Sequence, residues 1–77
     1  MSKPNNIFNV EMEKSLIAAL FIREGEIIPN VAAILQPDDF YRPEHRIIYN
    51  AILDVYNKNG NCDFLSVNDL LRKKGTP

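Results

Sequence analysis

The 77 residues have room for one domain with a small core, so the chain is expected to have low stability on its own. Apolar residues make up 45% of the chain and charged residues 25%, which is typical of a folded domain and argues against a disordered tail. The net charge of −1 argues against a dedicated nucleic-acid-binding protein, because such proteins usually carry a strong basic excess.

The cellular compartment is predicted from three further features. Cys62 is the only cysteine, so no disulfide can form within the chain. Residues 1–6 contain no apolar signal-peptide region, and the longest apolar run, residues 16–22, is too short to cross a bilayer. Together these features predict a cytoplasmic protein.

The chain is predicted to contain a flexible lead over residues 1–8 and a single domain over residues 9–77. The lead is polar and contains a proline and two asparagines. Gly75 is expected to stop the last helix, so residues 76–77 are interpreted as part of a loop. The domain is therefore expected to be truncated at its C-terminal end.

The first helix is predicted to begin at Asn9, whose side chain can act as the N-cap. Glu11 and Glu13 then lie in the first turn, where the helix dipole favours negative charge. Residues 12–22 are apolar on most faces, which predicts a central core helix that ends near Gly25. The alternative for this segment is a lipid-binding helix.

Pro29 suits the first turn of a short second helix, and this helix is expected to carry residues 31–35 and to end before Pro37. A corner follows, in which the carboxylates of residues 38–39 are expected to bond nearby backbone amides. At least one of the next two aromatic residues, Phe40 and Tyr41, is expected to fill the core.

Pro43 is expected to begin a long third helix that reaches about Lys58. Apolar side chains recur along it at helical spacing, which predicts one buried stripe. This stripe contains Ile47, Ile48, Ala51, Ile52, Val55 and Tyr56. Asp54 is expected to pair with Lys58 on the solvent face, and residues 59–60 are expected to end the helix.

A last short amphipathic helix is predicted to carry Val67, Leu70 and Leu71, with Ser66 as its N-cap and Asp69 at the third position. The connector before it is expected to contain one or two buried apolar residues. The four helices, without a convincing strand, predict an all-α fold, a small orthogonal helix bundle.

His45 is the one histidine and lies on the inward face of the third helix. A metal site needs several ligands at paired spacing, so a structural role is favoured. The imidazole is expected to bond a backbone carbonyl, or a carboxylate of Asp38 or Asp39, and so to lock the corner. The alternative is a partner contact or a pH-sensitive interface. The two aspartates are interpreted as caps rather than as an acid–base pair or metal ligands.

The remaining candidates also favour structural roles. Cys62 has no basic neighbour in sequence that would lower its thiol pKa, which argues against a nucleophile. The basic residues 72–74 complement the dipole at a helix C-terminus, with a phosphate contact as the alternative. The sequence contains no Gly-rich phosphate loop. No catalytic, cofactor-binding or metal site is predicted, and the chain is interpreted as a scaffold or interaction module.

Two patterns in the sequence resemble those of a known family. In the first, Glu13 and Ala19 match a helix that opens Ala-Glu-x-x-Val-Leu-Gly-Ala, and Ala18 replaces the glycine. The second and more specific pattern is Leu-x-x-x-Asp-Phe-Tyr-x-x-x-His-x-x-Ile-Tyr/Phe-x-Ala-Ile. It is matched by Leu35, Asp39, Phe40, Tyr41, His45, Ile48, Tyr49, Ala51 and Ile52, and Gly60, Asp63, Ser66, Leu70 and Leu71 continue the resemblance. Residues 9–75 therefore resemble the N-terminal domain of the replicative hexameric DNA helicases, the DnaB family.

This resemblance implies a collar domain that supports hexamer assembly as a dimer or a trimer of dimers, and that contacts primase and the helicase loader. It implies architectural roles for Glu13, Asp39, Phe40, Tyr41, His45, Ile48 and Asp63. ATP, Mg and DNA would be bound by a separate RecA-like ATPase domain, so the fragment itself is expected not to be an enzyme. A helical hairpin of the family's domain is also expected beyond this chain. The alternatives are the helicase-interacting domain of a primase and a small helical DNA-binding module.

Overall fold

The computed structural model describes residues 10–75, and every element in that range is helical. The elements are α1 (Val10–Ala19), η1 (Ile22–Glu24), α2 (Ile28–Ala32), η2 (Pro37–Asp39), α3 (Pro43–Asn59) and α4 (Phe64–Lys73), where η denotes a 3-10 helix. This arrangement confirms the predicted all-α fold. The predicted lead over residues 1–8, the Asn9 cap and residues 76–77 lie outside the described residues.

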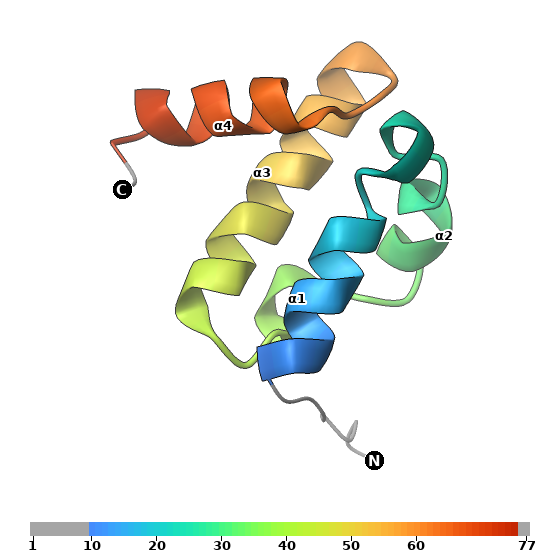
Figure 1. The fold of residues 1–77 in the computed structure, drawn as a ribbon, viewed down its shortest axis with the longest axis vertical. Coiled ribbons are helices and arrows are strands. Elements are labelled where there is room, and N and C mark those ends of the chain that lie inside the picture. The colour runs from blue at the N-terminus through green and yellow to red at the C-terminus, as the bar shows by residue number, and fades with distance from the viewer. Residues whose placement is uncertain (1–9, 76–77) are drawn as a thin grey trace.

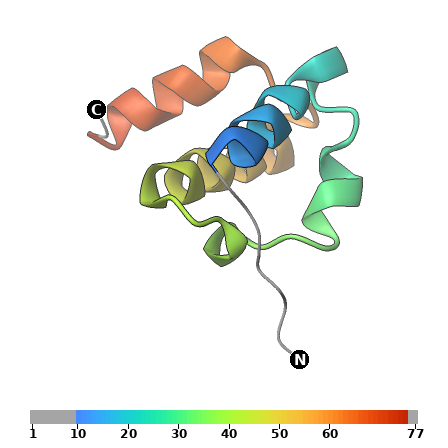
Figure 2. The same ribbon diagram turned by 60° about the horizontal axis from the view of Figure 1, so that its bottom comes forward.

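The longest helix, α3, is the centre of the bundle. Helices α1, α2, η2 and α4 all pack against it. Helix α1 lies beside α3, and α4 crosses α3 near its C-terminal end (Figures 1 and 2). Tyr49, Ala51 and Ile52 of α3 are fully buried, and burying a large apolar side chain such as Ile52 contributes about 1.5–3 kcal/mol.

The prediction that the first helix is the central core helix is wrong. Within α1 the only buried residue is the charged Glu13, while Leu16 and Ile17 are half-buried and pack against the core. Although α1 is apolar on most faces, it covers only one side of α3, and Met12 stays exposed.

Helix α1 also ends at Ala19, before the predicted end near Gly25. Arg23 and Glu24 adopt left-handed backbone conformations, with φ of 52° and 56°, and Gly25 follows with φ of 93°. Leu20, just after the end of α1, is buried in the core. The Glu24 carbonyl accepts a hydrogen bond of 2.8 Å from the Cys62 amide. This turn therefore joins the start of the chain to the connector before α4.

The second helix is shorter than predicted, and the third agrees with its prediction. Helix α2 ends at Ala32, which leaves Ile34 78% exposed. Helix α3 begins at Pro43 and ends at Asn59, and Gly60 caps it in a left-handed conformation with φ of 82°. The predicted stripe omits the fully buried Tyr49 and includes Ile47, which is 44% exposed at the edge of the stripe.

The start of the fourth helix differs from the prediction. Asp63, not Ser66, is the N-cap, because its carboxylate accepts a 3.2 Å hydrogen bond from the Ser66 amide. Phe64 and Leu65 therefore begin α4 and are exposed, while Cys62 is the buried residue of the connector.

The predicted pairing of Asp54 with Lys58 is also replaced by another contact. Asp54 Oδ2 lies 3.5 Å from Nζ of Lys74, just after the end of α4. This contact joins the solvent face of α3 to the C-terminal end of α4. No helix within residues 10–75 is long and apolar enough to cross a membrane.

Candidate functional site

The corner, defined here as residues 36–45, joins α2 to α3 through η2. The Gln36 amide donates a 2.7 Å hydrogen bond to Asp39 Oδ2, which closes η2. This confirms the predicted capping role of Asp39. The chain then becomes extended at Phe40 and Arg42 before Pro43 begins α3. Proline suits this first turn because its fixed φ is already helical and it has no amide hydrogen to satisfy.

Glu13 of α1 holds the corner in place, because its carboxylate accepts three hydrogen bonds from it. One oxygen, Oε2, accepts from the Tyr41 amide. The other, Oε1, accepts from the Arg42 amide at 3.3 Å and lies 2.7 Å from Nδ1 of His45. The carboxylate thus satisfies two amides at the start of a helix, where no backbone partner is available. The Glu13 and His45 residues are 3% and 7% exposed.

The corner favours the ionised form of Glu13. Burial alone would raise the pKa of this carboxyl group, but the hydrogen bonds from the Tyr41 amide, the His45 ring and the Arg42 amide lower the pKa below its ordinary value. An ionised carboxylate only accepts hydrogen bonds, so Nδ1 of His45 must carry the hydrogen. The pair is therefore a charge-assisted contact between α1 and α3.

Aromatic side chains fill the space beneath the corner. Phe40 is 2% exposed and its ring centroid lies 4.9 Å from that of Tyr49 and 6.5 Å from that of His45. The Tyr49 hydroxyl donates a 2.8 Å hydrogen bond to the Leu35 carbonyl. Phe40 is therefore the aromatic residue that fills the core, as predicted, while Tyr41 is 69% exposed.

Arg46 closes the corner from the solvent side. Its Nε donates to the Phe40 carbonyl at 2.8 Å and its Nη2 to the Tyr41 carbonyl at 3.3 Å. Arg42 is occupied elsewhere, since its guanidinium pairs with Glu44. The backbone carbonyls and amides of the corner are thus bonded by side chains from both α1 and α3.

The structure brings five predicted motif residues together at the corner: Glu13, Asp39, Phe40, Tyr41 and His45. Ile48 is half-buried one turn further along α3, and Asp63 is separate, at the N-cap of α4. His45 does bond a carboxylate, but the predicted source of that carboxylate was wrong. The partner comes from α1 rather than from Asp38 or Asp39.

The hydrogen-bond partners of Glu13 were not predicted from the sequence. Its expected function was to complement the helix dipole from the first turn. The available signal was its spacing, because Glu13 lies three residues before Leu16 and seven before Leu20 and so shares their inward face. A carboxylate on the inward face of a helix needs buried partners, and the corner amides supply them.

The polar groups of the corner stabilise the fold by bonding one another. Both oxygens of Glu13 are engaged by amides and the imidazole. Elsewhere, burial raises the pKa of the Cys62 thiol to about 11, so the thiol is protonated at neutral pH. Within residues 10–75, no group of three or more His, Cys, Asp or Glu side chains is placed to hold a metal ion.

The family model of the DnaB-like helicase N-terminal domain matches residues 4–77. The chain is 38% identical over 66 residues to the replicative DNA helicase DnaB of Rhodothermus marinus. This match covers 86% of this chain and 7% of that protein. It is 33% identical over 73 residues to the replicative DNA helicase DnaC of Bacillus subtilis, covering 87% of this chain and 16% of that protein. No solved structure matches. The chain belongs to the DnaB-like helicase N-terminal domain family.

The matched relatives are much longer than this chain. The 77 residues span 7% of the Rhodothermus marinus protein, 16% of the Bacillus subtilis protein and 10% of the replicative DNA helicase DnaB of Mycobacterium leprae, to which the chain is 33% identical over 63 residues. The match is thus to a small part of a replicative helicase, described by the family model as the N-terminal domain.

Proposed function

We propose that this chain is a non-catalytic interaction domain of a replicative DNA helicase. In this proposal it supports assembly of the hexamer, as a dimer or a trimer of dimers, and contacts primase and the helicase loader. The observation that carries the proposal is the match to the family's N-terminal domain over nearly the whole chain. The helicase would act in the cytoplasm, where it would unwind duplex DNA at the replication fork.

The distribution of side chains supports a role in protein contacts rather than in catalysis. The polar groups of the corner bond one another, while large apolar side chains remain on the surface. Within residues 10–75, those exposed by more than half are Met12, Ile22, Ile34, Tyr41, Phe64 and Leu65. Such side chains are available for contact with other subunits or other proteins. ATP, Mg and DNA would be handled by a separate RecA-like domain of the helicase.

The test uses the purified 77-residue chain, the full-length helicase, and the primase and helicase loader of the same organism. Light scattering after size exclusion measures self-association, and biolayer interferometry measures binding of the chain to primase and to the loader. We expect binding to at least one of these partners and no ATP hydrolysis by the chain. A chain that stays monomeric and binds neither protein would refute the proposal.

A DNA-binding assay separates the proposal from the DNA-binding alternative. Fluorescence polarisation of a labelled single-stranded oligonucleotide is measured at about 50 and 200 mM salt, since binding through several phosphates weakens steeply over that range. We expect no salt-dependent binding by the isolated chain, because its net charge is −1. Tight binding that disappears at the higher salt would favour the DNA-binding module.

A further inference from the structure

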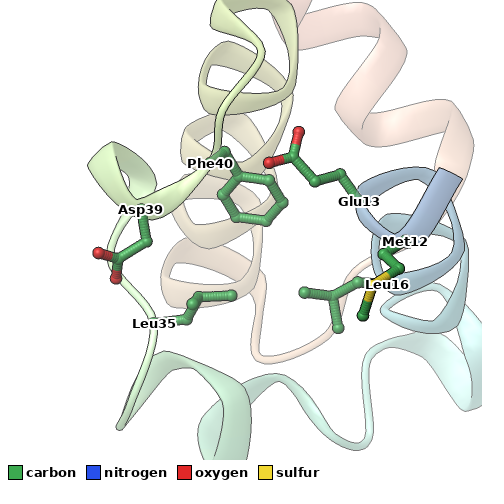
Figure 3. A pocket seen from close by; sticks show the side chains of 6 residues that line it. All are labelled: Met12, Glu13, Leu16, Leu35, Asp39 and Phe40. Carbon is green, nitrogen blue, oxygen red and sulfur yellow. The ribbon is translucent and has the colours of Figure 1, made fainter. Parts of the chain in front are cut away.

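An apolar cleft of about 210 Å³ opens on the side of the corner that faces α1 and the end of α2. Leu35 points into it from one side, Leu16 from the other, and the Phe40 ring closes its inner end (Figure 3). Met12 lies beside Leu16, and Glu13 and Asp39 complete the lining. The wall is therefore almost entirely hydrocarbon, and its polar atoms lie at the edges.

The size of the cleft fits one large side chain. Pockets that hold small-molecule ligands usually have volumes of about 300–1,000 Å³, so this cleft is small for a cofactor or metabolite. An aromatic or leucine side chain that anchors a protein segment is of suitable size, and such anchors supply much of the energy of protein interfaces. Apolar surface continues to the rim of the cleft, because Met12, one of its lining residues, is 59% exposed.

The negative charge beside the cleft favours segments that carry positive charge. Asp39 lies at its edge, where its carboxylate also accepts a hydrogen bond from the Gln36 amide, and the exposed Asp38 precedes it in η2. None of the six lining residues is cationic. The mouth of the cleft is thus apolar at its centre with carboxylates beside it.

We propose that this cleft binds a partner protein's segment in which one aromatic or leucine side chain is flanked by lysine or arginine. The apolar side chain enters between Leu16 and Leu35 and packs on Phe40. The flanking cations lie near Asp38 and Asp39. This inference rests on the proposed interaction role and adds the chemistry of the segment that the domain recognises.

The first test is a titration of the ¹⁵N-labelled chain, followed by NMR, with the peptide acetyl-Lys-Lys-Phe-Lys-Lys-amide. The titration extends to about 2 mM, because a single anchored side chain gives affinities near the millimolar range. We expect shifts for the amides of Leu16, Leu35 and Phe40. Matched peptides with Ser for Phe, or Glu for Lys, are expected to bind at least about tenfold more weakly. Equal binding of the three peptides, or shifts away from the cleft, would overturn the proposal.

Variants of the chain locate the contact. Met12→Gln and Asp38→Asn change exposed residues, so the fold is retained, and each is expected to weaken binding of the Phe peptide about threefold or more. Leu65→Gln is the matched control, because Leu65 is 65% exposed but lies on α4, away from the cleft. If removal of residues 1–8 strengthens binding, the occupant is the chain's own N-terminal segment and the partner proposal fails.

The same variants separate this proposal from the proposed function. Met12→Gln is expected to weaken binding of primase or loader, while Leu65→Gln is not expected to weaken it in the same way. If wild type and Met12→Gln bind the partner equally, the cleft proposal fails and the interaction role stands. If the wild-type chain binds neither primase nor loader but still binds the Phe peptide, the proposed function fails and the cleft remains a peptide site.

Discussion

Nδ1 of His45 lies 2.7 Å from Oε1 of Glu13, and this contact between residues 32 positions apart in the sequence joins α1 to α3. Both residues are buried, and the same carboxylate also accepts hydrogen bonds from the Tyr41 and Arg42 amides. The contact therefore fixes the position of α1, the corner and the first turn of α3 together. In a domain with such a small core, this polar cluster is expected to be important for stability.

Replacing Glu13 with Gln is expected to lower the free energy of unfolding by about 1–3 kcal/mol, because the amide accepts fewer hydrogen bonds and carries no charge. Urea unfolding followed by circular dichroism measures the change. Glu11→Gln is the matched control, since Glu11 lies in the same turn of α1 but is exposed. A surface substitution of this kind is expected to change stability by less than about 0.5 kcal/mol. Equal effects of the two substitutions would show that the corner does not depend on Glu13.

His45→Ala is expected to destabilise the domain without changing its helical architecture, since it removes the imidazole that bonds Glu13. A double-mutant cycle with Glu13→Gln tests whether the two residues act together. The double variant should be less destabilised than the sum of the single variants, by about 0.5–3 kcal/mol. The matched cycle with Glu11→Gln should be additive. An unchanged unfolding midpoint in His45→Ala would contradict the role of this residue in locking the corner.

The stability of the domain is expected to fall in acid because the folded state lowers the pKa of Glu13. A carboxyl group whose pKa is lower in the folded state binds fewer protons there than in the unfolded state. Its contribution is therefore complete above its ordinary pKa of 4.5 and is lost as the pH falls through the lower folded value. Urea midpoints measured between pH 7 and pH 3 should decline less steeply in Glu13→Gln than in the wild type. Part of the decline should remain, because the pKa values of the exposed Glu44 and Asp63 are also lowered.

The parts of the fold that sequence reasoning predicted are those governed by local rules. Pro43 and Gly60 are strong signals for the start and end of a helix, and α3 has those bounds. Phe40 was expected to be a core residue because an aromatic side chain within a turn needs a place to pack. The family was predicted from the Asp39-to-His45 spacing, which reflects the corner as a whole.

The errors arise where tertiary contacts decide the local structure. Helix α1 ends early because Leu20 enters the core and the Glu24 carbonyl bonds the Cys62 amide, a partner 38 positions away. Either Ser66 or Asp63 could cap α4 on local grounds, and Asp63 is the residue that does so. The Glu13–His45 contact likewise needs α1 and α3 to be packed side by side, which residue spacing within one helix does not indicate.

Tyr49→Phe is expected to lower stability by about 1 kcal/mol, because the Leu35 carbonyl would lose its hydrogen bond from the Tyr49 hydroxyl. The ring would remain in the core beside Phe40, so the packing should be nearly unchanged. Tyr41→Phe makes the same chemical change at an exposed residue and should have little effect. Thermal and urea unfolding of both variants provide the measurement. If Tyr41→Phe is the more destabilising of the two, the assignment of Tyr49 as the link between α3 and the segment after α2 is wrong.

Gly25→Ala is expected to be one of the most destabilising single substitutions in the domain. The residue has φ of 93°, and an added Cβ would lie 2.7 Å from Cδ1 of Ile28 and 3.2 Å from Cβ of Cys62. Gly60→Ala is the matched control, because its φ is 82° but an added Cβ would have no heavy atom within 4 Å. Both variants suffer the backbone strain of about 1–2 kcal/mol, and only Gly25→Ala adds a clash with the fully buried core. Urea unfolding should therefore show a larger loss for Gly25→Ala, and a loss equal to that of Gly60→Ala would mean that the core around Ile28 yields without cost.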